Sequence, residues 1–356
     1  MIPPEKPPGR LGRRTVLSGI GLAGAGGLAP VGRARAQAAG AAFSNDLVAA
    51  ARKEGTVVLH SGEDAALLGQ LARAFQTRFS GITVTTARAD TEAQLQAFAD
   101  GGVGKTVDVL TTTDLARMVD LRRAGRLALF IPDEVKRWPE TARDPDGFYC
   151  FTALGLMVLG YNQKLVPAEQ IPKSYADLLG PRFVDKLTSV HPGYSGGGLT
   201  ATVLLANALG WPFFEQLARQ GVLQVPSAAE AVERVATGER SAMVYGSEQA
   251  AFRQKAAGAP VGIVYPADGS PGVPSATAIL REAPHPNAAR LLATWMVGKE
   301  AQEIVIGAGA RSFHPDMREP TGHIALSAIK VLNPDPILIS AEADLVKTFY
   351  SQLFAK

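Results

Sequence analysis

The sequence predicts an α/β protein built as two lobes, and three observations lead to this prediction. Residues 56–124 alternate short β-type runs with segments of helical spacing, which is the pattern of a parallel sheet covered by helices. Residues 149–159 form a long apolar run, with a length that suits a strand crossing between lobes. Residues 186–265 then alternate again as a second α/β lobe. A chain of 356 residues is long enough to give each lobe a sizeable core.

The first lobe starts with a short helix that ends before Gly55. Its strands are expected at residues 56–60, 82–86 and 106–110, and its helices at residues 45–53, 65–79, 91–100 and 114–124. The helix at 65–79 is the clearest, because Leu68, Leu71 and Phe75 recur at helical spacing. Gly81 ends it before the next strand.

Hydroxyl groups gather where the strands of the first lobe end. A parallel sheet presents ligand groups at the carboxyl ends of its strands. Those ends are predicted to carry Ser61, Gly62, Glu63, Arg88, Thr112 and Thr113. Any single Ser or Thr there can instead be an ordinary helix N-cap, but the repetition at three strand ends favours a ligand.

The second lobe contains a glycine-rich loop at its first strand end. Strands are expected at 186–190, 241–245 and 261–266, helices at 199–209, 213–220 and 228–237, a returning strand at 275–280 and a first-lobe helix at 288–297. Ser195 and the glycines 196–198 lie between strand and helix. Free amides at a helix N-terminus, together with the helix dipole, favour an anion. A simple tight turn is the alternative interpretation of this loop.

The N-terminus has the three parts of a secretory signal. Residues 1–36 combine a basic start containing Arg13-Arg14, an apolar stretch and a small-residue end. The arginine pair is typical of twin-arginine export. Without this segment the chain carries 30 basic and 32 acidic residues, which argues against a nucleic-acid binder. No later segment reaches the roughly 18 apolar residues of a membrane helix.

Cysteine and histidine give no sign of a metal site. The only cysteine, Cys150, lies in an apolar context and is expected in the core. The five histidines show no metal-ligand spacing. We therefore expect no metal ligands and no cofactor.

Several short sequence motifs occur in a fixed order: Glu54-Gly55-Thr56-Val57-Val58, Val107-Asp108-Val109, Gly160-Tyr161-Asn162, Asp177-Leu178-Leu179, Gly238-Glu239, Tyr265-Pro266-Ala267-Asp268-Gly269 and Glu300-Ala301-Gln302. Together they resemble the family-1 extracellular solute-binding proteins of ABC importers, in the ferric-iron-binding-like branch. The resemblance implies a type II periplasmic binding protein: two lobes, a ligand cleft between them, hinge closure and a membrane permease as partner. We assign residues 44–150 plus 268–325 to lobe 1 and 151–267 plus 326–356 to lobe 2, and expect a monomer in the periplasm.

The resemblance leaves ferric iron as an alternative cargo. Iron-binding relatives carry two adjacent tyrosines where this chain has Tyr245-Gly246, and often a histidine where it has Ser61-Gly62-Glu63-Asp64. Ferric iron requires several hard anionic oxygen donors, which one tyrosinate and Glu63 or Asp64 supply poorly. The hydroxyl-rich strand ends fit a phosphate ester, phosphonate or carboxylate better.

A serine hydrolase is the second alternative. Gly193-Tyr194-Ser195-Gly196-Gly197 matches the nucleophile-elbow pattern, with Asp268 and His285 or His314 following in order. The pattern is short, however, and His191-Pro192 separates the serine from its strand.

The sequence thus predicts capture of a small anionic solute without catalytic residues. Ser195, Gly196 and Gly197 are expected to bind it from one lobe, and the strand ends from the other. Tyr245 is expected to line the cleft through its hydroxyl, and Glu248 to meet a cationic part of the solute.

Overall fold

The computed structural model describes residues 43–88 and 106–355, and residues 42–356 form one compact unit. The predicted signal segment at residues 1–36 and the predicted helix at 91–100 lie outside the described residues. No single described helix is long and apolar enough to cross a membrane. Helices α6 (Gly196–Leu209) and α7 (Trp211–Ala218) would together be long and apolar enough, but the pair is bent by 111°.

The first half of the fold follows the predicted order. It contains α2 (Asn45–Glu54), β1 (Thr56–Ser61), α3 (Ala65–Arg78), β2 (Thr83–Arg88), β3 (Val109–Thr112) and α5 (Leu115–Arg123), then 3-10 turns at Asp133–Arg137 and Glu140–Ala142. Strands β2, β1 and β3 are neighbours and parallel. Gly55 ends α2 with φ 71°, a left-handed conformation that suits glycine.

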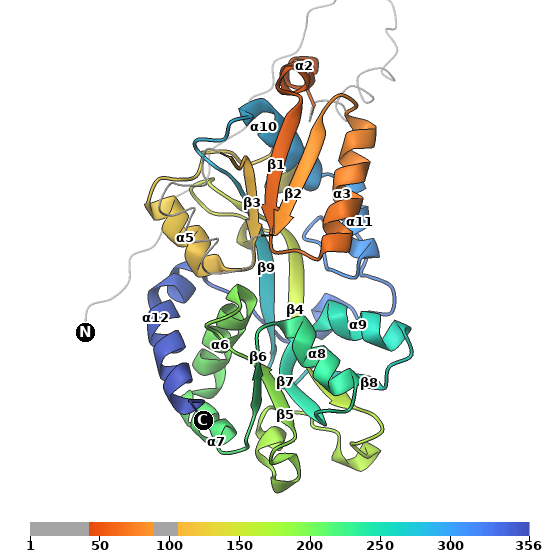
Figure 1. Cartoon of the computed structure of the whole chain (residues 1–356), viewed down its shortest axis with the longest axis vertical. Coiled ribbons are helices and arrows are strands. Elements are labelled where there is room, and N and C mark those ends of the chain that lie inside the picture. The colour runs from red at the N-terminus through yellow and green to blue at the C-terminus, as the bar shows by residue number, and fades with distance from the viewer. Residues whose placement is uncertain (1–42, 89–105, 356) are drawn as a thin grey trace, which may run out of the picture. The chain divides into compact units, whose positions relative to one another are not determined.

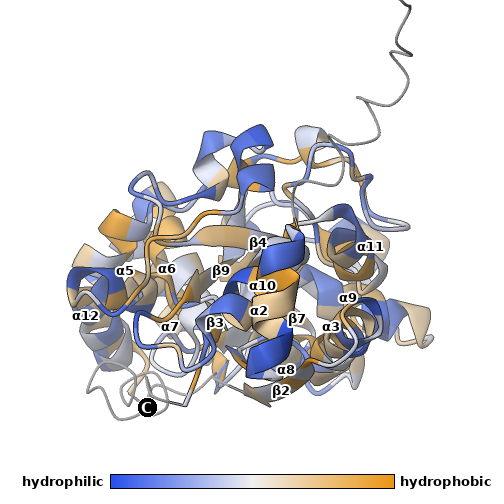
Figure 2. Ribbon diagram, turned by 90° about the horizontal axis from the view of Figure 1, so that it is seen from above, coloured by the Kyte–Doolittle hydropathy of each residue, from blue (hydrophilic) through white to orange (hydrophobic). Residues whose placement is uncertain are grey.

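The long apolar run becomes β4 (Cys150–Asn162), and everything from there to residue 264 belongs to the second set of elements. These are β5 (Leu187–Val190), α6 (Gly196–Leu209), α7 (Trp211–Ala218), β6 (Leu223–Val225), α8 (Ala228–Ala236), β7 (Ala242–Ser247), α9 (Glu248–Ala256) and β8 (Val261–Val264). Short 3-10 turns at Ala168–Gln170, Ala176–Leu179 and Pro181–Phe183 precede β5. Helix α8 buries Ala231, Val232 and Val235. Helix α2, which is nearest the viewer in Figure 2, likewise carries both hydrophilic and hydrophobic residues, as expected when one face is buried.

The chain returns through β9 (Ser270–Ile279), followed by α10 (Pro286–Met296), α11 (Lys299–Gly307), a 3-10 turn at Leu326–Ala328, β10 (Val331–Leu332) and α12 (Pro336–Leu353). The sheet order is β2-β1-β3-β9-β4-β7-β5-β6, with β8 paired to β4 and β10 to β9. Strands β4 and β9 run side by side and antiparallel between the two sets of elements (Figure 1). They are therefore the crossing strands that the sequence predicts.

Two separate cores flank the crossing strands, and a third cluster joins them. One core packs α3 and α10 against β1, and another packs α6, α7 and α8 against β5 and β7. The third contains Leu115 and Met118 of α5, Leu199 of α6, and Ile339 and Val346 of α12. Helix α12 thus packs against helices of both sets.

Candidate functional site

The glycine loop is built as predicted, with Ser195 as the N-cap of α6. Its Oγ accepts a hydrogen bond from the Gly198 amide at 3.1 Å, and its carbonyl accepts one from the Leu199 amide. The cap therefore uses the Gly198 amide. Gly196 and Gly197 occupy the first helical turn, whose amides have no acceptor within the helix.

The strand-end hydroxyls of the first set cap their own loops. Ser61 is fully buried and its Oγ accepts from the Glu63 amide at 3.1 Å. Thr112 Oγ1 accepts from the Asp114 amide at 3.0 Å, and Asp114 in turn caps α5 by accepting from the Arg117 amide. In this structure these side chains therefore act as capping groups, the alternative role that the sequence left open for each of them.

The glycine loop and the end of β3 nevertheless meet. Thr200 Oγ1 of α6 donates to the Thr113 carbonyl at 3.5 Å. A Cβ on Gly196 would lie 2.4 Å from Asp114 Cβ and 2.6 Å from its Cα, so only glycine fits here. A Cβ on Gly197 would lie 3.5 Å from Thr113 Oγ1. The N-termini of α5 and α6 are thus in direct contact, and burial raises the pKa of the Asp114 carboxyl between them.

Arg88 is the last residue of β2 and pairs in register with Ser61. Gly62 follows Ser61, and its amide donates to the Thr111 carbonyl at 3.1 Å. Arg88 therefore lies at the same edge of the sheet as Ser61. Its side chain is outside the part of the chain that the structure describes.

Glu63 faces the crossing strands. Its carboxylate accepts a hydrogen bond from Ser275 Oγ of β9. It also borders a small cavity of about 20 Å³, whose lining includes Leu67 and Leu71 of α3 and Val305 of α11. Burial is the main reason that the pKa of Glu63 is raised, and the neighbouring Asp64 raises it further.

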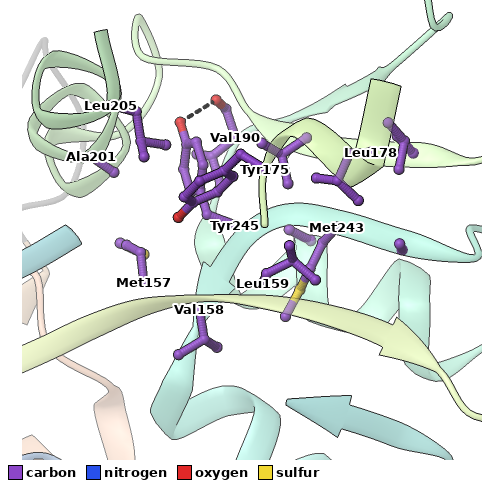
Figure 3. Close-up of a cluster of buried hydrophobic side chains, with 14 of the residues drawn as sticks. Met157, Val158, Leu159, Tyr175, Leu178, Val190, Ala201, Leu205, Met243 and Tyr245 are labelled. Carbon is purple, nitrogen blue, oxygen red and sulfur yellow. Dashed lines mark hydrogen bonds between the residues drawn. The ribbon is translucent and has the colours of Figure 1, made fainter. Parts of the chain in front are cut away.

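Tyr245 lies in the core, which differs from the predicted place at the surface of a cleft. Its hydroxyl donates to the Val190 carbonyl at 2.9 Å (Figure 3). The same hydroxyl is 2.9 Å from Thr202 Oγ1. The ring is fully buried beside Leu205 and Tyr175. Both faces of strand β7 are covered, since residues 242–246 are all buried, and Tyr245 lies under α6, where its hydroxyl also contacts the Gly198 carbonyl.

Glu248 also has internal partners, contrary to the prediction that it meets a cation of the solute. Arg311 binds both of its carboxylate oxygens, through Nε at 3.0 Å and Nη2 at 2.8 Å. The Tyr265 hydroxyl donates to it at 2.5 Å. Arg311 Nη1 also reaches Glu319 and the Ile324 carbonyl. The side chains of Arg311 and Glu248 are 1% and 3% exposed, so this is a buried ion pair.

Helix α9 makes two further contacts across the crossing strands. Arg253 Nη1 lies 2.8 Å from Asp64 Oδ2, at the N-cap of α3. Gln249 Nε2 donates to the carbonyl of Ala308, just after α11. The sequence reasoning assigned no helix to this segment and missed Arg253 and Arg311, although the Ser247 cap followed by Glu248 is a recognisable helix start.

Residues 119–322 match the sequence model of the family described as bacterial extracellular solute-binding proteins. The chain belongs to this family. The resemblance found in the sequence is therefore confirmed, and members of the family are binding proteins.

The fold of this solute-binding protein is found in several solved structures. Iron-bound HitA of Pseudomonas aeruginosa is 22% identical, with 83% of this chain and 99% of that chain covered and a TM-score of 0.72. AfuA of Actinobacillus pleuropneumoniae with bound fructose-6-phosphate is 18% identical. The match covers 85% of this chain and 99% of that chain, with a TM-score of 0.75. A substrate-binding protein of an Agrobacterium tumefaciens ABC transporter is 17% identical. The match covers 84% of this chain and 94% of that chain, with a TM-score of 0.76. The protein thus has the predicted two-lobed type II fold.

The residues suggested for a hydrolase do not come together in this solute-binding protein. Ser195 Oγ bonds to the Gly198 amide, His285 Nδ1 lies 2.9 Å from Asp108, and Asp268 accepts from the Tyr175 amide. His314 lies 3.4 Å from Glu134, in the first half of the fold. Ser195 is thus arranged as a helix cap.

We predict that Glu63→Gln stabilises the protein at neutral pH. A carboxyl whose pKa is raised by folding contributes stability below its unfolded pKa and loses it as pH rises through the folded pKa. Gln keeps an acceptor for Ser275 but has no charge to bury. We expect a gain on the order of 1 kcal/mol in the free energy of unfolding at pH 8, and little difference at pH 4. Urea unfolding at the two pH values measures this; an equal effect at both would contradict it.

Proposed function

We propose that this protein is the periplasmic receptor of an ABC importer and that it captures a small anionic solute without chemical change. The solute class is a phosphate ester, phosphonate or carboxylate. It would lie between the α6 N-terminus at Ser195, Gly196 and Gly197 and the strand ends at Ser61 and Thr113. Closure of the lobes over it would create the surface that the membrane permease recognises.

The observation that carries this proposal is the contact between the N-termini of α5 and α6. Each helix N-terminus carries positive partial charge and amides without intrahelical acceptors, so two of them in contact favour an anion held beside that contact. They belong to opposite lobes, so separation of the lobes would open this place to a solute. The proposal needs no cofactor and no partner other than the permease.

Ferric iron fits the described residues less well. Among residues 43–88 and 106–355, no three His, Cys, Asp or Glu side chains cluster to hold a metal ion. Burial raises the pKa of Tyr245 to about 12, which disfavours the phenolate that binds ferric iron. Its hydroxyl is also engaged inside the core.

Native mass spectrometry of the protein purified from the periplasm tests the proposal. We expect a bound mass that corresponds to an organic or inorganic anion and that is lost after unfolding and refolding. Ser195→Ala should weaken rebinding of that anion about tenfold, and it should remove a cap that contributes about 1 kcal/mol to stability. A bound ferric ion, or turnover of an ester that disappears in Ser195→Ala, would overturn the proposal.

A further inference from the structure

Arg253 and Asp64 form a link between the two lobes at the first turn of α3. Arg253 Nη1 lies 2.8 Å from Asp64 Oδ2, and the two residues are 189 positions apart. The other carboxylate oxygen, Oδ1, accepts from the Ala66 amide at 2.9 Å. One carboxylate thus receives a guanidinium and a helix amide, which is the donor set that an oxyanion commonly takes in proteins.

This link borders an open recess at the lobe interface. The recess has a volume of about 550 Å³, and its lining comes from Asp64 and from helices α8 and α9. Arg253 is the cation of that lining; the carboxylates of Glu230 and Glu233 border the recess too, and Glu230 is bound by Arg234 at 2.7 Å. The volume is in the range of small-molecule sites. Arg253 is thus the one counter-charge that the described lining of this recess offers to a solute anion.

The pair is weak enough to be exchanged. The side chains of Arg253 and Asp64 are 48% and 35% exposed, and ion pairs of this kind contribute about 0–1 kcal/mol. Arg253 hydrogen bonding is the main reason that the pKa of Asp64 is lowered, so the carboxylate stays charged at neutral pH. The buried ion pair that Glu248 of the same helix forms with Arg311 has no such access to solvent.

We propose that Arg253 is the cationic anchor for the anionic group of the solute, and that Asp64 occupies this place until the solute displaces it. The inference rests on the proposed function and adds a binding residue from α9 to it. Asp64 is then a competitor of the solute, whereas Arg253 is its partner. Substitutions of the two residues must therefore shift affinity in opposite directions.

The test is calorimetric titration of wild type, Arg253→Gln, Arg253→Lys and Asp64→Asn with glycerol 3-phosphate, methylphosphonate and succinate as probes, one for each proposed class of anion. For the probes that bind wild type, we expect Arg253→Gln to weaken binding at least tenfold and Arg253→Lys to restore part of it. Asp64→Asn keeps an acceptor for the Ala66 amide and should tighten binding several-fold.

Two control variants match these changes in chemistry. Arg137→Gln removes an ion-paired arginine of similar exposure, and neither it nor its partner Glu134 lines the recess; Asp335→Asn changes the N-cap of α12. Neither should alter affinity. If Arg253→Gln and Asp64→Asn both weaken solute binding, the ion pair only holds the two lobes together, and the proposal is overturned. Unchanged affinities in both variants would overturn it as well. Saturable binding of none of the probes to wild type would overturn the proposed anion receptor itself.

Discussion

Arg311→Met is expected to destabilise the protein by about 3–5 kcal/mol, measured as the free energy of unfolding in urea. The substitution leaves Glu248 buried, at 3% exposure, without the guanidinium that binds both of its oxygens. A buried carboxylate without a partner still carries the free-energy cost of desolvation but no longer has the attraction of a nearby positive charge that offsets it. Because Arg311 also binds Glu319 and the Ile324 carbonyl, the loss extends to the segment that follows α11.

Two further variants separate this effect from a general loss of packing. Arg311→Met combined with Glu248→Gln removes both charges and should recover a large part of the lost stability. Arg234→Gln, which removes an exposed ion pair on α8, should cost less than about 1 kcal/mol. A loss below 1 kcal/mol in Arg311→Met would show that Glu248 does not depend on this partner.

Gly196→Ala is expected to prevent the lobes from closing fully. The added methyl group would lie 2.4 Å from Asp114 Cβ and 2.8 Å from the Asp114 backbone nitrogen, so the two helix N-termini would have to separate. Overpacking of this kind costs about 1–3 kcal/mol, which corresponds to a loss of solute affinity of roughly 5- to 150-fold. Small-angle scattering should give a larger radius of gyration than for wild type in the same buffer.

Gly307→Ala is the matched control for this prediction. Gly307 lies at the end of α11, and an added Cβ would meet no atom within 4 Å. Alanine is the better helix former, so Gly307→Ala should leave the radius of gyration unchanged and the stability equal or slightly higher. If Gly196→Ala bound solute and compacted as wild type does, the closed contact at Asp114 would not be part of binding.

The order of elements was largely predictable, because local patterns encode it. The strands at 56–60 and 186–190, the helix at 65–79 and the crossing run at 149–159 all appear close to their expected places. Helix α12 was missed although its signals are local: Asp335 caps it, Pro336 starts it, and Ile339, Ala343 and Val346 recur at helical spacing.

The candidate site was predictable at its backbone but not in its side-chain partners. Ser195 is the N-cap that the glycine-rich pattern suggested, and the first-lobe strand ends do meet the lobe that carries it. Tyr245, in contrast, points into the core, since strand alternation alone does not say which face is covered. Glu248 was assigned to a solute because its partner lies 63 residues away.

The sequence by itself determined which segments are strands and helices, where the crossing strands run and which loop caps a helix with Ser195. These features depend on residues within one or two turns of each other, so the chain records them locally. Only the tertiary structure decided which charges are neutralised, since the partners of Arg253 and Arg311 lie 189 and 63 residues away. Folding the crossing strands between two lobes brings those groups together, and electrostatic energy depends on that distance and burial rather than on sequence order.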